Sequence, residues 1–429
     1  MRVRMAFGRH GLDIELPDGN VMDVLTMPAM PPLPAPQRAV ADALAVPIDA
    51  PPLVDLARGR RDAVIVVCDI TRPAPNRVML PPIIEALARA GIEQDRTTIL
   101  IATGLHRPNE GAELVEMLGP EIAGRLRVVN HRASEPSQQV RIGRTRSGTD
   151  VEIDAVYAGA DLKITTGFIE PHLMAGFSGG RKLCGIGCGS EATIRGLHAP
   201  RIIEHPDSIE GRLDGNILHE ELTEIADRVG MDFIVNVTLD ETHRVTGVFA
   251  GHFERAFGEG CEFAGRAVGR TVGREADIVV TSSAGYPQDI NYYQVAKGLT
   301  GARHVCKPGG TIIMVAECSE GLGKPEYVEL CREVSDVEGF LDRFVRAGPD
   351  VYNRARRNDQ WQIHNVTRAL RKCECHLVDG GLTPEQRGLL LHPAGPSFDE
   401  ALSAALARHG AGARIVVIPK GPNVLARVG

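Results

Sequence analysis

The pattern of hydrophobic and polar positions changes character at about residue 62. From there on, short apolar runs rich in β-branched residues alternate with longer segments rich in Ala, Leu and Glu. This alternation is typical of βαβ units around a parallel sheet. It predicts strands at 63–68, 97–102, 161–165, 233–237, 276–281, 311–315, 375–378 and 414–418. It predicts helices at 80–90, 110–118, 191–197, 256–269, 293–301, 328–333, 337–346, 359–372 and 397–408.

The same pattern indicates how the chain is divided. A charged stretch at 269–275 separates a long predicted helix from a new βαβ series. We therefore expect an α/β fold of two α/β domains with mainly parallel sheets, at residues 1–270 and 275–410. Residues 411–429 are expected to supply a last strand that returns to the N-terminal domain. Residues 1–20 predict a short hairpin, and residues 27–52, with eight prolines, predict an extended surface segment rather than a helix.

Composition narrows the possible functions. The 429 residues are 43% hydrophobic and 24% charged, which is typical of a globular protein. The net charge of −7 and the aromatic content of 4% argue against a nucleic-acid partner. The sequence contains no signal-peptide pattern and no apolar run of 18 residues, so we expect a cytoplasmic protein with no membrane partner. The nine cysteines lack paired CxxC spacing, which indicates a reducing compartment and argues against a zinc ribbon.

Polar residues gather where the predicted strands of the first half end, and open α/β sheets bind ligands at that edge. Strand 63–68 runs into DITRPAP at residues 69–75, in which Arg72 could clamp a carboxylate. Alternatively, Asp69 and Arg72 pair with each other or cap the next helix. Strand 97–102 runs into TGLHR, which places His106 just past the strand, although a lone loop histidine also suits a purely structural role.

The densest motif follows strand 161–165 and ends in SGGRK at residues 178–182. Its glycines would let backbone N–H groups approach an anion while Arg181 and Lys182 neutralise it, which predicts a nucleotide-phosphate site. The spacings GxxxxGK[ST] and GxGxxG are both absent. Lys182 is also a candidate nucleophile, because a neighbouring cation favours its neutral form; a plain phosphate-binding lysine is the alternative.

Other side chains are candidates for metal or anion binding, and each could instead have a structural role. His198 ends helix 191–197, where a neutral imidazole could bind a metal or merely cap the helix. Cys184 and Cys188 could approach a metal, although buried packing residues are the favoured interpretation. In the second half, Gln294 and Lys297 share one face at the start of a helix, which favours an anionic ligand; a solvated helix start is the alternative.

Four motifs in this order, DxTRPxP, TGxHR, EPHxxAGxSGGRK and QxxKG, resemble those of the nickel-dependent lactate racemase family. They occupy residues 69–75, 103–107, 170–182 and 294–298. The third is long and mixed enough to be specific, and the resemblance extends from about residue 69 to the end of the chain. It implies two α/β domains with the active site in the cleft between them, and a racemase or epimerase that inverts C2 of a 2-hydroxy acid.

The resemblance also implies a cofactor and a set of roles. The cofactor is a nickel-pincer nucleotide derived from nicotinic acid, covalently attached to Lys182, with His198 as the nickel ligand. His106 and His172 match the family's two acid/base histidines, and Arg72 and Lys297 match its contacts to the substrate carboxylate. The remaining matches are Tyr293 and Gln294 in the substrate pocket, and Asp69, Ser178, Gly179, Gly180 and Arg181 around the cofactor.

These residue types suit inversion by hydride transfer. Loss of hydride from C2 gives a planar 2-oxo acid that can take hydride back on either face, and this step is the cofactor's chemistry. The protein must take up the hydroxyl proton and return it, which two histidines can do. The implied partners are a small-molecule 2-hydroxy acid and, transiently, cofactor-biosynthesis enzymes, while the oligomeric state stays open.

Two other functions use part of the same residues. A nicotinamide-dependent 2-hydroxy-acid dehydrogenase would share the carboxylate clamp and the histidines, although GxGxxG is absent. A non-catalytic nucleotide-binding module would need only residues 178–182. After Lys182 the sequence LCGIGCG departs from the LPG-like turn expected of the family, so packing beside the cofactor is expected to differ. The resemblance leaves open whether the substrate is lactate-like, malate-like or a related 2-hydroxy acid. Candidates for contacting a second carboxylate or hydroxyl groups are Arg181, Arg195 and His131.

Overall fold

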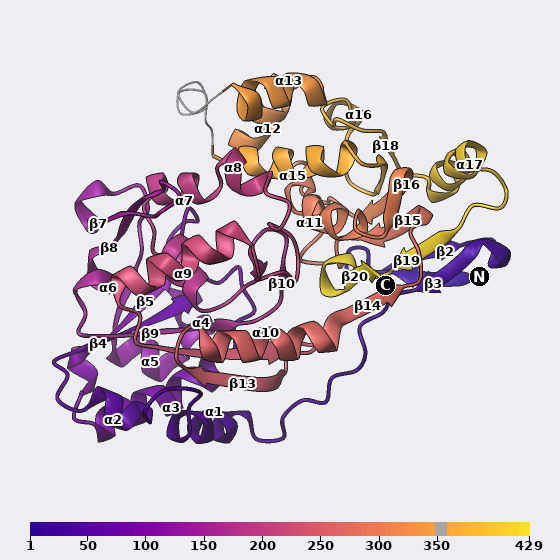
Figure 1. Cartoon of the computed structure of the whole chain (residues 1–429). Coiled ribbons are helices and arrows are strands. Elements are labelled where there is room, and N and C mark those ends of the chain that lie inside the picture. The colour runs from indigo at the N-terminus through magenta and orange to yellow at the C-terminus, as the bar shows by residue number, and fades with distance from the viewer. Residues whose placement is uncertain (348–357) are drawn as a thin grey trace. The chain divides into compact units, whose positions relative to one another are not determined.

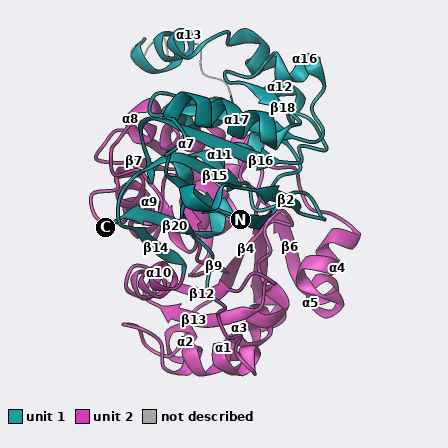
Figure 2. Cartoon of the chain, turned by 90° about the vertical axis from the view of Figure 1, so that its right-hand side faces the viewer, with its two compact units in different colours: residues 1–28, 268–429 teal, residues 29–267 magenta. Residues whose placement is uncertain are grey.

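The computed structural model describes residues 1–347 and 358–429, which form two compact units. Unit 1 comprises Met1–Pro28 and Val268–Gly429, and unit 2 comprises Ala29–Ala267 (Figures 1 and 2). Each unit is built on its own six-stranded sheet in which most neighbouring strands are parallel. The predicted fold class, α/β with mainly parallel sheets, is therefore confirmed.

The sheet of unit 2 has the strand order β13-β12-β9-β4-β5-β6, and only β13 is antiparallel to its neighbour. Every residue of β4 and β9 is buried, because helices cover both faces of a parallel sheet of this kind. The bounds are β4 (Ala63–Cys68), β5 (Thr97–Ala102), β6 (Arg127–Asn130), β9 (Leu162–Phe168), β12 (Phe233–Leu239) and β13 (Val245–Gly251).

Helices α1, α2 and α3 lie on one face of this sheet (Figure 1). Their buried side chains pack in one core with Ile65 and Ile99 of the sheet. The other face carries α6, α9 and a short π-helix, Leu183–Gly187. The helices of unit 2 are α1 (Pro36–Ala45), α2 (Leu53–Ala57), α3 (Asn76–Arg89), α4 (Ala112–Leu118), α5 (Pro120–Arg125), α6 (Ala155–Gly159), α7 (Glu191–Leu197), α8 (Pro200–Ile203), α9 (Ile217–Val229) and α10 (Arg255–Val268), the last ending at the unit boundary. Two hairpins complete the unit: β7 (Gln139–Arg144) with β8 (Asp150–Asp154), and β10 (Pro171–His172) with β11 (Gly176–Phe177).

The sheet of unit 1 has the order β18-β17-β16-β15-β19-β3 and is parallel throughout. Residues alternate between its two faces. Val279 points to the core under α11, α12 and α15, and Ile278 points to the core under α17 and the β1–β2 hairpin. The strands are β1 (Arg2–Met5), β2 (Leu12–Glu15), β3 (Val21–Val24), β14 (Gly269–Val272), β15 (Ala276–Ser282), β16 (Cys306–Ala316), β17 (Glu374–Asp379), β18 (Ala394–Gly395), β19 (Ile415–Ile418) and β20 (Leu425–Val428). The helices are α11 (Tyr292–Ala302), α12 (Pro325–Glu333), α13 (Val337–Leu341), α15 (Gln360–Leu370), α16 (Pro384–Arg387) and α17 (Phe398–His409).

Each sheet reverses its strand order at one point. In unit 2 the chain runs outward from β4 through β5 to β6, and then resumes on the other side of β4 with β9 and β12. In unit 1 it runs outward from β15 through β16 to β17, and then resumes on the other side of β15 with β19. Ligands of open α/β sheets bind beyond the carboxyl ends of the strands at such switch points. The two positions to inspect are therefore the ends of β4 and β9, and the ends of β15 and β19.

The N-terminal segment differs from the prediction. Residues 1–28 belong to unit 1, because β3 pairs with β19, so the C-terminal strand does not leave its own unit to join residues 29–267. The predicted hairpin at 1–20 is present as β1–β2. The proline-rich segment 27–52 is not extended throughout, since it contains α1. Pro36 stands at the start of that helix, where proline is tolerated, and no proline interrupts the remainder.

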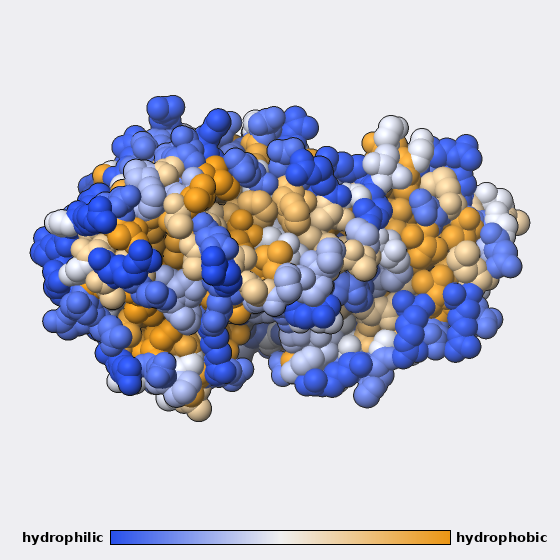
Figure 3. Space-filling view, turned by 90° about the horizontal axis from the view of Figure 1, so that it is seen from below, coloured by the Kyte–Doolittle hydropathy of each residue, from blue (hydrophilic) through white to orange (hydrophobic). Residues whose placement is uncertain are grey.

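Helix α9 was not among the predicted helices, although its sequence carries the usual signals. Its buried residues repeat at helical spacing, Asn216 caps its first turn, and Gly230 follows its end at φ 75°. No helix among residues 1–347 and 358–429 combines the length and apolarity needed to cross a membrane. On the face shown in Figure 3, hydrophobic residues form patches interrupted by hydrophilic ones.

Candidate active site

The loops that follow β4, β5 and β9 lie at one edge of the unit 2 sheet. These three strands are parallel neighbours, and Cys68 at the end of β4 is the register partner of Ala102 at the end of β5. The loop after β5 also contacts the helix after Lys182, since the backbone N–H of Gly104 donates to the carbonyl of Gly187 at 3.0 Å. The topology therefore brings the DITRPAP, TGLHR and EPHLMAGFSGGRK segments to one edge.

His106 and Asp69 form a hydrogen-bonded pair between two of these loops. The distance from His106 Nδ1 to Asp69 Oδ2 is 2.6 Å, and the Thr71 hydroxyl donates to Asp69 Oδ1 at 2.5 Å. Burial raises the pKa of Asp69, but the hydrogen bond and charge of His106 and the Thr71 hydroxyl outweigh it, so the pKa lies below its ordinary value. An ionised Asp69 requires a proton on Nδ1, which leaves Nε2 of the neutral ring as a proton acceptor.

The alternatives weighed for this loop can now be compared with the structure. Asp69 is 4% exposed and pairs with His106, not with Arg72. Helix α3 begins at Asn76 with no side-chain cap, so neither residue caps it. Arg72 is exposed and lies close enough to Asp69 for its charge to lower the pKa of that carboxyl. The guanidinium is therefore placed to meet an anion at this edge.

Lys182 and the DITRPAP loop share one electrostatic environment. Burial raises the pKa of the Cys68 thiol to about 12, and the charges that act on this thiol belong to Arg72, Asp69, Lys182 and Glu170. Those four side chains come from the loops after β4 and β9. The end of β4 is thus surrounded by two cations and two carboxylates, and Lys182 is one of the cations.

His198 follows α7, and its ring is held by a backbone group. Its Nδ1–H donates to the carbonyl of Ile194 at 2.8 Å, which leaves a lone pair on Nε2. Burial lowers the pKa of His198 to about 4 against the effect of the Ile194 carbonyl, and the charge of Lys182 also lowers it. A neutral imidazole with an unprotonated Nε2 is the form that ligates a metal.

His172 lies on the β10–β11 hairpin after β9. Its Nδ1 accepts hydrogen bonds from the backbone N–H groups of Met174, at 3.3 Å, and Ala175, at 3.1 Å. The hairpin closes at Gly176, where φ is 75° and an added Cβ would lie 2.2 Å from the carbonyl oxygen of Arg212. Only glycine suits this position, and the turn that holds His172 depends on it.

The SGGRK segment makes hydrogen bonds within the protein through groups that were predicted to bind a phosphate. The Ser178 hydroxyl donates to Phe168 O at 2.9 Å and accepts from Glu170 N at 3.1 Å. The backbone N–H of Gly180 donates to the Asn236 side chain at 3.0 Å. Ser178 and the backbone amides of this loop were predicted to contact a phosphate. To do so, Ser178 and Gly180 would have to give up the hydrogen bonds that they make within the protein.

Asn236 was missed in the sequence, yet its signal is visible. It interrupts the apolar strand β12 and is completely buried beneath the glycine loop. Gly179 has φ 107°, and an added Cβ would lie 2.6 Å from Asn236 Oδ1. The buried Asn236 amide therefore explains why position 179 is glycine.

Arg181 is not where the motif suggested. Its side chain is 0% exposed, Nε donates to His219 Nδ1 at 2.7 Å, and the guanidinium carbon lies 3.9 Å from the ring centroid of Phe257. Burial lowers the pKa of Arg181 to about 10. The guanidinium thus lies between α9 and α10, and the expectation that it contacts a second substrate carboxylate is not supported.

The other candidates for a second carboxylate are also engaged. His131 is 1% exposed, with Nδ1 2.9 Å from Asp154 Oδ2 and Nε2 2.9 Å from the carbonyl oxygen of Gly189. Arg195 forms an ion pair with Glu191 one turn earlier on α7. Both ring nitrogens of His131 are therefore engaged within the protein, and the expectation that it contacts a second substrate carboxylate is not supported.

Cys184 and Cys188 are buried in and beside the π-helix that follows Lys182. Burial raises the pKa of Cys184 to about 12 and the pKa of Cys188 well above its ordinary value. Thiols in this state are poor metal ligands, which supports the packing interpretation. Among the residues that the structure describes, no group of three or more His, Cys, Asp and Glu side chains is placed to hold a metal ion by itself.

In unit 1, helix α11 carries the predicted substrate residues and follows β15 at the switch point. The Tyr293 hydroxyl donates to Asp359 Oδ1 at 2.9 Å, and the Gln362 amide donates to the Tyr293 carbonyl at 2.7 Å. Gln294 and Lys297 lie one turn apart on the same helix. Tyr293 is thereby held by Gln362 of α15 and by Asp359, the residue before that helix. Gln294 and Lys297 have the i, i+3 spacing that places both on one face of α11.

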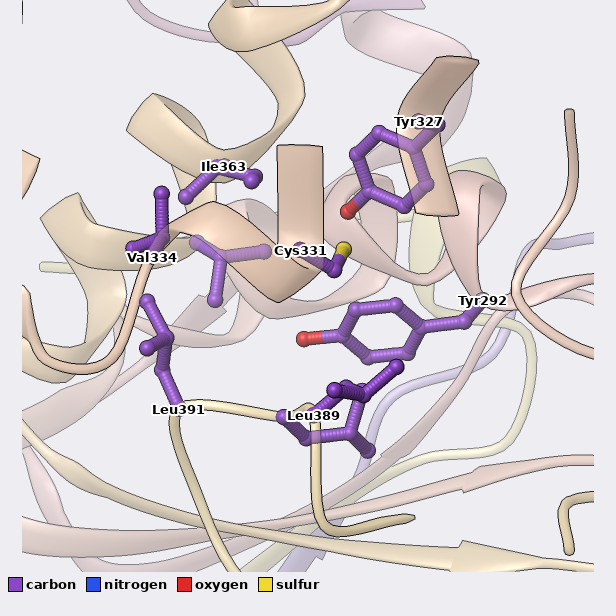
Figure 4. A pocket seen from close by; sticks show the side chains of 9 residues that line it. Tyr292, Tyr327, Cys331, Val334, Ile363, Leu389 and Leu391 are labelled. Atoms are coloured by element: carbon purple, nitrogen blue, oxygen red, sulfur yellow. The ribbon is translucent and has the colours of Figure 1, made fainter. Parts of the chain in front are cut away.

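The opposite side of α11 packs in the core. Tyr292, Tyr327 and Cys331 line an apolar pocket of about 10 Å³, together with Ile363 and Leu391 (Figure 4). The volume suffices for about one water molecule. Tyr292 OH is 2.8 Å from His392 Nε2, which satisfies its polar group. This pocket is a packing defect behind the helix and is too small to bind a substrate.

Comparison with known proteins gives consistent relatives over the whole chain. Residues 7–211 match the family model described as lactate racemase N-terminal domain, and residues 272–426 match lactate racemase C-terminal domain. A lactate racemase of Lactiplantibacillus plantarum is 36% identical over 391 residues, covering 91% of each chain. A lactate racemase of Thermoanaerobacterium thermosaccharolyticum is 33% identical over 432 residues, covering 99% of each.

Comparison with solved structures gives the same family. The lactate racemase apoprotein from Thermoanaerobacterium thermosaccharolyticum superposes with a TM-score of 0.92, at 33% identity and over 100% of both chains. A protein of Thermotoga maritima has a TM-score of 0.68 at 17% identity and covers 92% of this chain and 98% of its own. The second likeness concerns the fold alone.

Proposed function

The chain belongs to the lactate racemase family, and on that premise we propose that it inverts C2 of a 2-hydroxy acid, as a racemase or epimerase. The observation that carries the proposal is the Asp69–His106 pair beside Arg72. It combines a base, whose tautomer is held by a carboxylate, with a guanidinium that can bind a carboxylate. Lactate-like, malate-like and related acids carry both groups that this arrangement recognises, a hydroxyl and a carboxylate.

We further propose that the cofactor is a nickel-pincer nucleotide attached to Lys182, with His198 as the protein's nickel ligand. The donor set fits such a group, because the Nδ1–H of His198 is held by the Ile194 carbonyl, which makes Nε2 the unprotonated nitrogen of the neutral ring. The charge of Lys182 also acts on this ring. When bound, the nucleotide would accept hydride from C2 of the substrate and give it back. Enzymes that synthesise the nucleotide would be transient partners of the chain.

The chain's own residues would bind the substrate and move its hydroxyl proton. Arg72 and Lys297 would hold the carboxylate as charged donors, with Tyr293 and Gln294 beside Lys297 on α11. His106 would take the hydroxyl proton at Nε2, and Asp69 would stabilise the resulting imidazolium. His172 would serve as its counterpart when the proton is returned.

Two measurements on the protein produced together with cofactor-synthesis enzymes test the proposal. Intact-protein and peptide mass spectrometry should find an adduct on Lys182 and no adduct in Lys182→Arg. A matched control is Lys163→Arg, since Lys163 lies at the amino end of β9, where its ammonium donates to Ala160 O. A chiral assay over a panel of 2-hydroxy acids should show loss of optical purity with no added nicotinamide. An unmodified Lys182 in protein that does not racemise any member of the panel would reject the proposal.

A further inference from the structure

The turn around His172 determines which of its ring nitrogens carries the proton. Nδ1 accepts two backbone N–H groups, those of Met174 and Ala175. A nitrogen that accepts hydrogen bonds has no proton, so the neutral ring must carry its proton on Nε2. His106 is the reverse, because Asp69 requires the proton on Nδ1. The two histidines therefore present opposite groups at Nε2: an acceptor in His106 and a donor in His172.

The carbonyls of the same turn are held by two buried side chains. Asn216 Nδ2 donates to Met174 O at 2.8 Å, and Arg181 Nη2 donates to Ala175 O at 3.3 Å. Both residues are 0% exposed. Asn216 is itself fixed at the start of α9, where its Oδ1 accepts the backbone N–H groups of Leu218 and His219, each at 3.1 Å.

Arg181 is fixed from the other side. Its Nε donates to His219 Nδ1 at 2.7 Å, and its guanidinium lies over the ring of Phe257. Burial lowers the pKa of His219 to about 3, and the charge of Arg181 lowers it further, so His219 is a neutral acceptor. The first turn of α9 therefore fixes both Asn216 and Arg181, the two donors to the carbonyls of the His172 turn.

We propose that Asn216 and Arg181 are positioning residues for His172, which keep its neutral ring in the Nε2–H form. This inference rests on the proposed function for its consequence: in this conformation His106 accepts the substrate's hydroxyl proton, and His172 donates a hydrogen bond to a substrate oxygen. The division of labour between the two histidines is thus unequal. Before His172 could act as a base at Nε2, its Nδ1 would have to lose both amide donors and gain a proton.

The test reads the tautomer directly, by NMR of apoprotein labelled with ¹⁵N-histidine. His172→Gln identifies the His172 signals by their disappearance. Asn216→Asp keeps the oxygen that caps α9 but replaces the Nδ2 donor with an oxygen facing Met174 O. Arg181→Met removes the other donor and keeps an apolar chain against Phe257. Thr383→Ala, which removes the cap of α16 in unit 1, is the control for loss of a helix cap.

We expect wild-type His172 to show an unprotonated Nδ1 and a protonated Nε2, and Asn216→Asp and Arg181→Met to mix the two tautomers. Thr383→Ala should leave the signals unchanged. In the cofactor-loaded enzyme, kcat should fall by about tenfold to a hundredfold in the two variants, with little change in KM. A wild-type proton on Nδ1, or unchanged His172 signals in both variants, would overturn the inference. Because the signals come from apoprotein, an absence of racemisation in loaded wild type counts against the proposed function alone.

Discussion

His106 Nδ1 lies 2.6 Å from Asp69 Oδ2, across the ends of two adjacent parallel strands, β4 and β5. The imidazole is 38% exposed and the carboxylate 4% exposed, so the proton-accepting group faces out of the sheet edge and its partner is enclosed. The second carboxylate oxygen is held by the hydroxyl and the backbone N–H of Thr71. A carboxylate fixed in this way sets both the tautomer and the orientation of the base.

Replacing Asp69 with Asn should therefore harm catalysis more than stability. The amide can still bond Nδ1 but no longer requires a proton there, so Nε2 loses its role as acceptor. We expect kcat to fall by about a hundredfold or more, with KM changed less. The control is Asp161→Asn at the amino edge of the same sheet, where Asp161 pairs with Arg60. Equal rates for Asp69→Asn and wild type would show that His106 does not depend on this carboxylate.

The glycine loop before Lys182 should tolerate no side chain at Gly179. A methyl group there meets Asn236 Oδ1 at 2.6 Å, in addition to the strain of a φ of 107°. Gly148 provides a matched control, since its φ is 99° and nothing lies within 4 Å of an added Cβ. In urea unfolding, Gly179→Ala should lower the free energy of unfolding by about 1–3 kcal/mol more than Gly148→Ala does. Equal losses would mean that the loop moves away from Asn236 at little cost.

The α/β class, the family and the enzyme class, an isomerase of the racemase type, were predictable from the sequence and are confirmed. The reason is that βαβ rhythm and local motifs are short-range signals. Arg181 is an example of what such signals cannot predict. Its place in SGGRK predicts an anion-binding group, but its side chain is buried against His219 and Phe257, which lie far along the chain. Motif spacing contains no information about which of two adjacent cations is buried.

The N-terminal segment shows a second limit. Strand β3 has four residues, and its partner β19 lies near the other end of the chain. A pairing over that separation is determined by the sheet edge that happens to be open, not by any pattern near residue 21. Helix α9 is different, because its capping residue and the helical spacing of its apolar residues are visible in the sequence. Because α9 was not predicted, its capping residue Asn216 and its first-turn residue His219, which anchor the His172 turn, were also missed.

Acid should destabilise unit 1 through Asp277. Two hydrogen bonds from Arg414 lower the pKa of this carboxyl most strongly, and Lys307 adds to them against the effect of burial, so the pKa lies well below its ordinary value. Because the folded-state pKa is depressed, the stabilisation is fully present above the unfolded pKa of about 3.9 and is lost as the pH falls through the folded value. Asp277→Asn should therefore lower the free energy of unfolding at pH 7 and flatten its dependence on pH below 4. Parallel curves for variant and wild type across that range would assign the acid sensitivity to other groups.

His198 and Lys182 should be separable by substitution, since the first is proposed to bind nickel and the second to carry the nucleotide. His198→Ala removes the unprotonated Nε2 but leaves Lys182 and the loop that holds it. Protein produced with the cofactor-synthesis enzymes should then keep a mass adduct on Lys182, contain less nickel by elemental analysis, and racemise more slowly by about a hundredfold. His205→Ala is the control, because Nδ1 of that ring accepts a backbone N–H from Asp207 at 3.3 Å and His205 has no proposed role in the metal site. Full nickel content in His198→Ala would show that this histidine is not a nickel ligand, without contradicting the attachment at Lys182. Loss of both nickel and the Lys182 adduct would show that nickel binding and attachment depend on each other.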